Sequence, residues 1–365
     1  MKKNILKFGS LAAIALAFNL GLTSCNGGGA ANGSDSSSSS AESTIVGAGS
    51  SFDNPLFSKM FASYHDSTKI QVNYQSVGSG AGISQLTGKT VDFGASDAPM
   101  TGKQDSAAAA TVIHIPVTAG AVVVSYNLPE VKDTLKFTPE VLANIFLGKI
   151  TKWNDPAIAA VNPGVKLPAT AILVAHRSDG SGTSAIFTSF LDKVSTEWHS
   201  KVGTSTAVNW PTGVGGKGNE GVSGVVKQTP GGIGYIELAY AIQNQISYGQ
   251  VQNKAGKFIT PTIESVTAAA NTNIPADGKV WISNSDVPDG YPIAGFSWVL
   301  LYQEQGYGNR TQAQAEQLVN LVNWMIHDGQ QFSADLHYAP LSPAAVSVGE
   351  ALLKSATYKG QPILK

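Results

Sequence analysis

The sequence contains a single cysteine among 365 residues, so a disulfide bond within the chain is impossible. Charged residues make up only 13% of the chain and no run of Lys and Arg occurs, which excludes the electrostatic footprint of a nucleic-acid-binding protein. The six histidines lack the close spacing of metal ligands, so neither a metal nor a cofactor is expected. After position 25, no apolar run reaches the roughly 20 residues that a membrane-spanning helix needs.

The first 24 residues have the organisation of a secretory signal. Lysines at positions 2, 3 and 7 precede an apolar stretch over residues 11–22, which is too short to span a bilayer. Small residues then lead to Cys25, an ending that resembles a bacterial lipobox and accounts for the unpaired thiol. We therefore expect residues 1–24 to be a lipoprotein signal peptide. Export to the periplasm or cell surface follows, with a lipid on Cys25 as the membrane anchor.

Residues 25–44 are mostly Gly, Ser, Ala and Asn, with five consecutive serines at positions 36–40. Such a segment cannot bury enough apolar surface to fold, so it is expected to be a flexible tether. The remaining chain, residues 45–365, exceeds the size at which a single hydrophobic core usually stops growing. Two domains are therefore expected.

Short runs rich in β-branched residues alternate with helical patterns, which is typical of βαβ units. The alternation predicts an α/β fold with mainly parallel sheets, in which ligands bind beyond the carboxyl ends of strands. Residues 291–293 precede the apolar run 296–302 and are a candidate hinge, where the chain returns to its first domain. Strands are predicted at residues 44–46, 70–75, 111–115, 121–127, 171–175, 233–236 and 298–302, and helices at 54–64, 80–86, 139–147, 184–194 and 311–327.

Three segments share a Gly-rich turn that carries hydroxyl groups and runs directly into a predicted helix. They are residues 47–52 (GAGSSF), 77–82 (VGSGAG) and 177–184 (RSDGSGTS). Backbone N–H groups at a helix start favour an anion, glycines let the backbone approach it, and hydroxyls add further donors. Each turn alone is also compatible with an ordinary Ser N-cap. The third adds Arg177, whose planar guanidinium group suits a tetrahedral oxyanion.

Asp97 follows a predicted strand end in the segment 91–99 (VDFGASDAP) and is unexpected beside an anion site. A carboxylate repels a fully ionised anion, but it can accept a proton from monohydrogen or dihydrogen phosphate. Sulfate carries no such proton. The alternative interpretation is that Asp97 caps its local turn, a frequent use of Asp in loops.

Long blocks after the tether resemble the phosphate-binding receptors of bacterial phosphate ABC transporters. The matching blocks are residues 47–52, 91–99, 147–150, 152–153, 179–184, 215–219 and 232–235. The resemblance implies the two-lobed periplasmic-binding-protein fold of type II, with mixed, mainly parallel sheets and a ligand cleft between the lobes. Lobe I is then expected to comprise residues 45–118 and 293–365, and lobe II residues 119–292.

The resemblance also assigns roles to individual residues. It implies high-affinity binding of inorganic phosphate and its delivery, by a monomer without enzymatic activity, to the permease and ATPase subunits of an ABC importer. Asp179 resembles the aspartate that pairs with the arginine of the site. Ser51 stands where many relatives have Thr, and His176 where some have a second basic residue. The expected phosphate ligands are Ser51, the Phe52 backbone, Ser79, Asp97, Arg177, Ser181, Gly182 and Thr183.

Other functions fit the sequence less well. A receptor for sulfate or molybdate would share the three turns, but a ligand without a proton disfavours Asp97. A secreted phosphatase would use Ser181, yet its surroundings are not a Gly-x-Ser-x-Gly elbow and no activating base is evident. Residues 82–90 nearly match a nucleotide-binding P-loop, but one residue too many separates the glycines.

Overall fold

One mixed β-sheet runs through the chain in the computed structural model, which describes residues 44–364. The predicted signal peptide and nearly all of the tether, including Cys25, lie outside the described residues. Within residues 44–364, no helix is long and apolar enough to cross a membrane. The strand order is β2-β1-β3-β12-β4-β8-β6-β7, with β9 beside β4. These strands are β1 (Thr44–Gly49), β2 (Gln71–Ser76), β3 (Phe93–Ser96), β4 (Val112–Tyr126), β6 (Leu173–Arg177), β7 (Val214–Gly216), β8 (Gly232–Glu237), β9 (Ser247–Tyr248) and β12 (Ala294–Tyr302).

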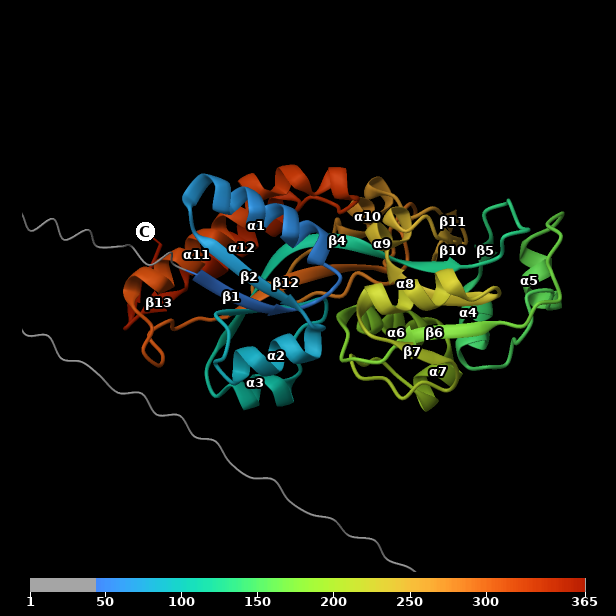
Figure 1. The fold of residues 1–365 in the computed structure, drawn as a ribbon, viewed down its shortest axis with the longest axis horizontal. Coiled ribbons are helices and arrows are strands. Elements are labelled where there is room, and N and C mark those ends of the chain that lie inside the picture. The colour runs from blue at the N-terminus through green and yellow to red at the C-terminus, as the bar shows by residue number, and fades with distance from the viewer. Residues whose placement is uncertain (1–43, 365) are drawn as a thin grey trace, which may run out of the picture. The chain divides into compact units, whose positions relative to one another are not determined.

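Helices follow most of these strands, as the alternating sequence pattern predicts. Figure 1 shows α1, α11 and α12 grouped at one end of the sheet and α4, α6, α7 and α8 at the other. The helices are α1 (Asn54–Thr68), α2 (Ser79–Thr87), α3 (Gly102–Ala108), α4 (Pro139–Phe146), α5 (Pro156–Val161), α6 (Gly182–Val194), α7 (Thr196–Lys201), α8 (Gly218–Gln228), α9 (Leu238–Gln243), α10 (Ile263–Ala270), α11 (Gln312–Ile326) and α12 (Pro343–Lys354), with 3-10 turns η1 (Asp328–Phe332) and η2 (Ala334–Leu336). Small sheets are formed by β5 (Lys136–Phe137), β10 (Gln250–Gln252) and β11 (Phe258–Ile259), and by β13 (Thr357–Tyr358) and β14 (Gln361–Pro362).

The long strand β4 belongs to both ends of the sheet. Its first part pairs antiparallel with β12, as far as Ala121, and from Val122 onward it pairs antiparallel with β8. The ends of the sheet are parallel instead, through β1–β2 and β1–β3 on one side and β6–β7 and β6–β8 on the other. All residues of β4 and β12 are buried. The chain therefore crosses between the two parallel ends along two central strands.

The sequence-based prediction of two strands at residues 111–115 and 121–127 was wrong, because β4 is continuous. Pro116 lies within this stretch, and proline cannot donate a hydrogen bond to a neighbouring strand. The structure accommodates it at a bulge, where Ser297 pairs with Thr118 and Trp298 with Pro116. The extra residue at a bulge is left out of the regular pairing, so the strand continues past the proline.

Candidate anion-binding site

The three Gly-rich turns all lie at the carboxyl ends of parallel strands. Residues 47–52 include the end of β1 and the turn after it, and residues 77–82 follow β2. Residues 177–184 begin at the last residue of β6. Helix α2 begins at Ser79 and α6 begins at Gly182, so two helix N-termini lie within these turns. The strands thus deliver backbone N–H groups and hydroxyls to one place, as expected for ligand sites in α/β proteins.

Asn219, at the start of α8, joins the first turn to the third. Its backbone N–H and its side-chain amide both donate to Ser51 Oγ at 3.0 Å. The same amide donates to Thr183 Oγ1 at 3.1 Å, which also accepts from Arg177 Nη1 at 3.3 Å. Because both hydroxyl oxygens accept from the protein, each keeps its own proton for a further acceptor.

The second turn meets the third through Ser79. The Gly182 N–H donates to Ser79 Oγ at 3.1 Å, and the Ser184 N–H donates to Ser181 Oγ at 3.0 Å. Ser181 is therefore the N-cap of α6, as the interpretation of this turn as an ordinary Ser N-cap predicts. Accepting these bonds does not use the proton of either hydroxyl, so Ser79 and Ser181 both remain donors.

Arg177 is the cation of the site and is only 3% exposed. Asp179 holds it through two hydrogen bonds, from Nε at 2.8 Å and from Nη2 at 2.5 Å. Burial raises the pKa of Asp179, but the bonds and charge of Arg177 outweigh burial, so the pKa lies below the ordinary value. A Cβ at Gly78, where φ is +90°, would lie 2.2 Å from Asp179 Oδ2, so only glycine fits there. The pairing with Asp179 leaves Nη1 of Arg177 to donate to Thr183 Oγ1.

Asp97 lies directly after β3 and is 1% exposed. Its Oδ1 accepts from Ser297 Oγ at 2.8 Å, whereas Oδ2 has no hydrogen-bond partner among residues 44–364. Burial raises its pKa to about 6, although the Ser50 hydroxyl, the Ser297 bond and the charge of Arg177 act in the opposite direction. A Cβ at Gly182 would lie 2.5 Å from Asp97 Oδ2, so a larger residue at 182 would collide with this carboxyl group.

Asp97 does not cap its local turn, which was the alternative explanation for it. Ser96 performs that role, because its hydroxyl donates to the Ala98 carbonyl at 2.6 Å and accepts from the Ala98 N–H at 3.2 Å. The carboxyl group of Asp97 is thereby free of a local structural task. Its unpartnered oxygen is a hydrogen-bond acceptor among groups that are otherwise donors.

The backbone of Phe52 lies at the edge of the same site. Its N–H donates to Ser50 Oγ at 2.9 Å, and the Ser50 hydroxyl lowers the pKa of Asp97. The structure thus brings together all the residues that the sequence selected. Those eight are Ser51, Phe52, Ser79, Asp97, Arg177, Ser181, Gly182 and Thr183.

His176 does not add a second positive charge beside Arg177. Its ring stacks on Trp210 at 13° with 5.1 Å between ring centroids, and burial lowers its pKa below the ordinary value. The imidazole is therefore neutral at neutral pH. Arg177 supplies the positive charge that this segment contributes to the site.

Sequence reasoning missed four residues that contact the site: Ser50, Asp53, Asn219 and Ser297. Asn219 ends the block 215–219 that carried the family resemblance, and its place at a helix start after β7 could have singled it out. Ser50 lies inside the first Gly-rich turn. Nothing local marks Ser297, because it reaches Asp97 across a separation of 200 residues, through the pairing of β12 with β3.

Comparisons with known proteins establish the family of this chain. Residues 34–328 match the family model described as PBP superfamily domain. The Phosphate-binding protein PstS of Xylella fastidiosa is 44% identical over 311 residues, which are 84% of each chain. That of Methanocaldococcus jannaschii is 36% identical over 334 residues, which are 86% of this chain and 85% of the relative.

The chain belongs to the PstS family of phosphate-binding proteins. Solved structures of proteins with such names share its fold at lower sequence identity. A high affinity periplasmic phosphate-binding protein, PfluDING, superposes with a TM-score of 0.69 at 20% identity, covering 84% of this chain and 93% of the other. A phosphate-binding protein from Stenotrophomonas maltophilia gives 0.63 at 18% identity, covering 85% and 94%. The predicted periplasmic-binding-protein fold is thus confirmed.

The raised pKa of Asp97 predicts a pH-dependent penalty in the ligand-free protein. Because the folded-state pKa of about 6 exceeds the ordinary value of 3.8, the folded state binds more protons between these values. Its stability relative to the unfolded chain then falls as the pH rises through this window. In the Asp97→Asn variant this contribution is absent. We therefore expect the Tm of the variant minus that of the wild type to increase from about pH 4 to about pH 6.5.

The measurement is thermal unfolding of the ligand-free proteins across that pH range. Asp286→Asn is a matched control, because the side chain of Asp286 is 84% exposed and its pKa is lowered by Lys254. This control is expected to show no such increase. A Tm difference for Asp97→Asn that does not change with pH would contradict the prediction.

Proposed function

We propose that this chain is a receptor that binds inorganic phosphate with high affinity and delivers it to an ABC-type phosphate importer. The observation that carries the proposal is the unpartnered carboxyl oxygen of Asp97 among converging donors. The proposed ligand groups are the hydroxyls of Ser51, Ser79, Ser181 and Thr183, the guanidinium of Arg177, the backbone N–H groups of Phe52 and Gly182, and Asp97. Membership of the PstS family supports the same ligand.

The balance of donors and acceptors favours a protonated oxyanion. Monohydrogen phosphate offers oxygens to the hydroxyls and to Arg177, and one O–H that can donate to Asp97. Sulfate would place an oxygen without a proton against the same carboxylate, inside a site from which water is excluded. Rejection of a ligand that cannot make a required buried hydrogen bond can reach about 10⁴- to 10⁵-fold. Asp97 is therefore proposed as the group that selects phosphate over sulfate and molybdate.

We propose that the site lies between two lobes, formed by residues 45–118 with 293–365 and by residues 119–292. Hydrogen bonds between the two sets of residues support a site between them. The Gly80 N–H donates to the Gly180 carbonyl at 2.9 Å, and the Asn219 N–H donates to Ser51 Oγ. The site side chains are at most 3% exposed, so a ligand can enter only if these bonds open. The hinge would lie where β4 changes partners, beside the Val122 N–H bond to the Ile293 carbonyl.

The receptor is proposed to act as a monomer and to catalyse no reaction. A binding protein with a closed site would hand phosphate to the permease and ATPase subunits when the lobes open. The phosphatase alternative uses Ser181, but that hydroxyl caps α6 and accepts from Ser184. Hydrolysis of a chromogenic phosphate ester that disappears in Ser181→Ala would support the phosphatase instead.

Calorimetric titration of residues 45–365, stripped of bound ligand, tests the function directly. We expect one phosphate per chain and little or no heat with sulfate. In Asp97→Asn, sulfate binding should become measurable while phosphate binding weakens by at least about tenfold, because the neutral amide cannot accept the ligand proton as a carboxylate does. The exposed-site variant Asp286→Asn should bind like the wild type.

Failure of the wild type to bind phosphate would overturn the proposed function and reopen the other oxyanions. Phosphate binding combined with unchanged sulfate rejection in Asp97→Asn would leave the receptor intact but remove the selective role of Asp97.

Closure of the lobes predicts a change in distance between them. Residues 45–365 contain no cysteine, so Ser58→Cys on α1 and Lys201→Cys on α7 can carry spin labels without interference. Both positions are exposed. Phosphate should shorten and narrow the measured distance distribution, whereas sulfate should not. An identical distribution with and without bound phosphate would argue against hinged lobes.

We further propose that the exported protein is anchored through a lipid on Cys25, with residues 1–24 removed. The lipobox-like ending of the apolar stretch supports this assignment. In a bacterial host, the wild type should incorporate labelled fatty acid and sediment with membranes. Cys25→Ser should do neither, and equal membrane association of both forms would contradict the anchor.

A further inference from the structure

Three carboxyl groups are buried at the proposed site. Asp53, Asp97 and Glu237 are at most 1% exposed, and one oxygen of each has no hydrogen-bond partner among residues 44–364. Only Asp97 has a task in the site as described so far. Asp53 directly precedes α1, a position where Asp ordinarily caps the helix, but its side chain makes no capping bond. Its carboxyl group is turned toward β12 instead.

Ser297 on β12 bridges the two aspartates. Its Oγ lies 2.5 Å from Asp53 Oδ2 and 2.8 Å from Asp97 Oδ1. A serine hydroxyl has one proton and can donate it to one of these oxygens only. If both carboxyl groups were ionised, the other contact would place two unprotonated oxygens at hydrogen-bonding distance inside a dry core. Both contacts are hydrogen bonds only if one carboxyl group carries a proton.

The surroundings decide which carboxyl group holds that proton. Besides the Ser297 bond, the Ser50 hydroxyl and the charge of Arg177 both lower the pKa of Asp97 and so favour its charged form. Asp53 has only the Ser297 bond to favour ionisation, and burial and the charge of Asp97 oppose it, which raises its pKa well above the ordinary value. The other titratable groups that act on the pair are Glu237 at the end of β8, Tyr74 on β2 and Tyr338 after η2.

We propose that Asp53 is protonated and donates to Ser297, which donates its own proton to Asp97, so that Asp97 stays an ionised acceptor for the proton of the ligand. This inference rests on the proposed phosphate function for its purpose, but not for the position of the proton. Asp53 and Ser297 are positioning residues, because they act through Asp97. The chain of two hydrogen bonds runs from α1 through β12 to the turn after β3, all on the side of lobe I.

The arrangement lets a buried pair of acids hold a single negative charge. Without a proton on Asp53, an anionic ligand would meet two neighbouring carboxylates and Arg177 alone would have to balance them. Without the Ser297 bond, Asp97 would lose a donor that favours its charged form, and the neutral acid would gain population. A neutral Asp97 can donate to an oxygen of sulfate, so selectivity depends on the bridge.

Infrared difference spectroscopy of the ligand-free protein at neutral pH tests the position of the proton. The wild-type-minus-Asp53→Asn spectrum should show the C=O band of a protonated carboxyl group. The control Asp286→Asn, which removes an exposed aspartate whose pKa is lowered by Lys254, should show only ionised carboxylate bands. Carboxylate bands for Asp53 as well would overturn the proposal.

A second measurement does not depend on folding of the Asp53 variant. In wild-type protein labelled with ¹³C at aspartate side-chain carboxyls, one resonance should keep the shift of a protonated acid at neutral pH. A spectrum in which every aspartate is ionised would overturn the proposal. Both experiments use ligand-free protein, so they decide the position of the proton even if the chain fails to bind phosphate.

Ser297→Ala tests the bridge. It should lower the ratio of phosphate to sulfate affinity by about tenfold or more, the usual effect of a lost hydrogen bond to a charged group. An unchanged ratio in a folded Ser297→Ala protein would show that the bridge does not act on Asp97 and would overturn this part of the inference.

Discussion

The buried ion pair of Arg177 and Asp179 is the interaction on which the rest of the site depends. A guanidinium group that is 3% exposed needs a partner, because an isolated buried charge is strongly destabilising. Asp179 supplies this partner and also accepts the Gly218 N–H at 3.0 Å, which ties the turn after β6 to the start of α8. Gly78 approaches the same carboxylate from the second turn. One aspartate thus positions groups from three segments.

Charge balance extends from this pair into the acidic residues behind it. Asp97 lies near Arg177, and its ionisation is favoured by that charge and by two serine hydroxyls against the effect of burial. Asp53 lacks such support, which is why two acids so close together can differ in protonation. A site that contains one cation, one available carboxylate and several hydroxyl donors is suited to an oxyanion that retains a proton.

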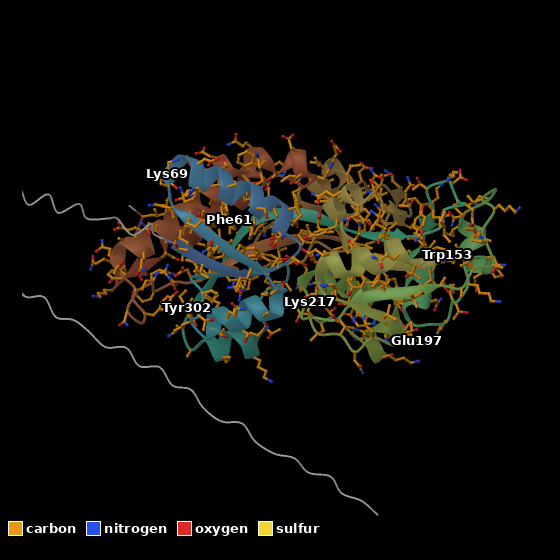
Figure 2. The ribbon with its side chains drawn as sticks, viewed as in Figure 1. Phe61, Lys69, Trp153, Glu197, Lys217 and Tyr302 are labelled. Carbon is orange, nitrogen blue, oxygen red and sulfur yellow. The ribbon has the colours of Figure 1, made fainter. Side chains whose placement is uncertain are left out.

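The two central strands explain how the site can be both enclosed and accessible. Strands β4 and β12 carry the chain between the two parallel ends of the sheet (Figure 1). Ser297, which contacts Asp97, lies on β12. Lys217, labelled in Figure 2, directly precedes α8, where Asn219 reaches across to Ser51. Bonds of this kind join the proposed lobes directly, and the crossing strands offer the hinge about which they could separate.

The sequence by itself indicated the α/β class, and its resemblance to a known family implied the eight residues that gather at the site. Seven of the eight lie in Gly-rich turns before helices, which are local features with a local physical cause. The sequence did not determine that residues 112–126 form one strand, since Pro116 interrupts the pattern and only its pairing opposite Trp298 explains how the strand continues. Nor did it reveal the roles of Asp53 and Ser297. Those roles arise from burial and from a contact between residues 244 positions apart, which only the tertiary structure decides.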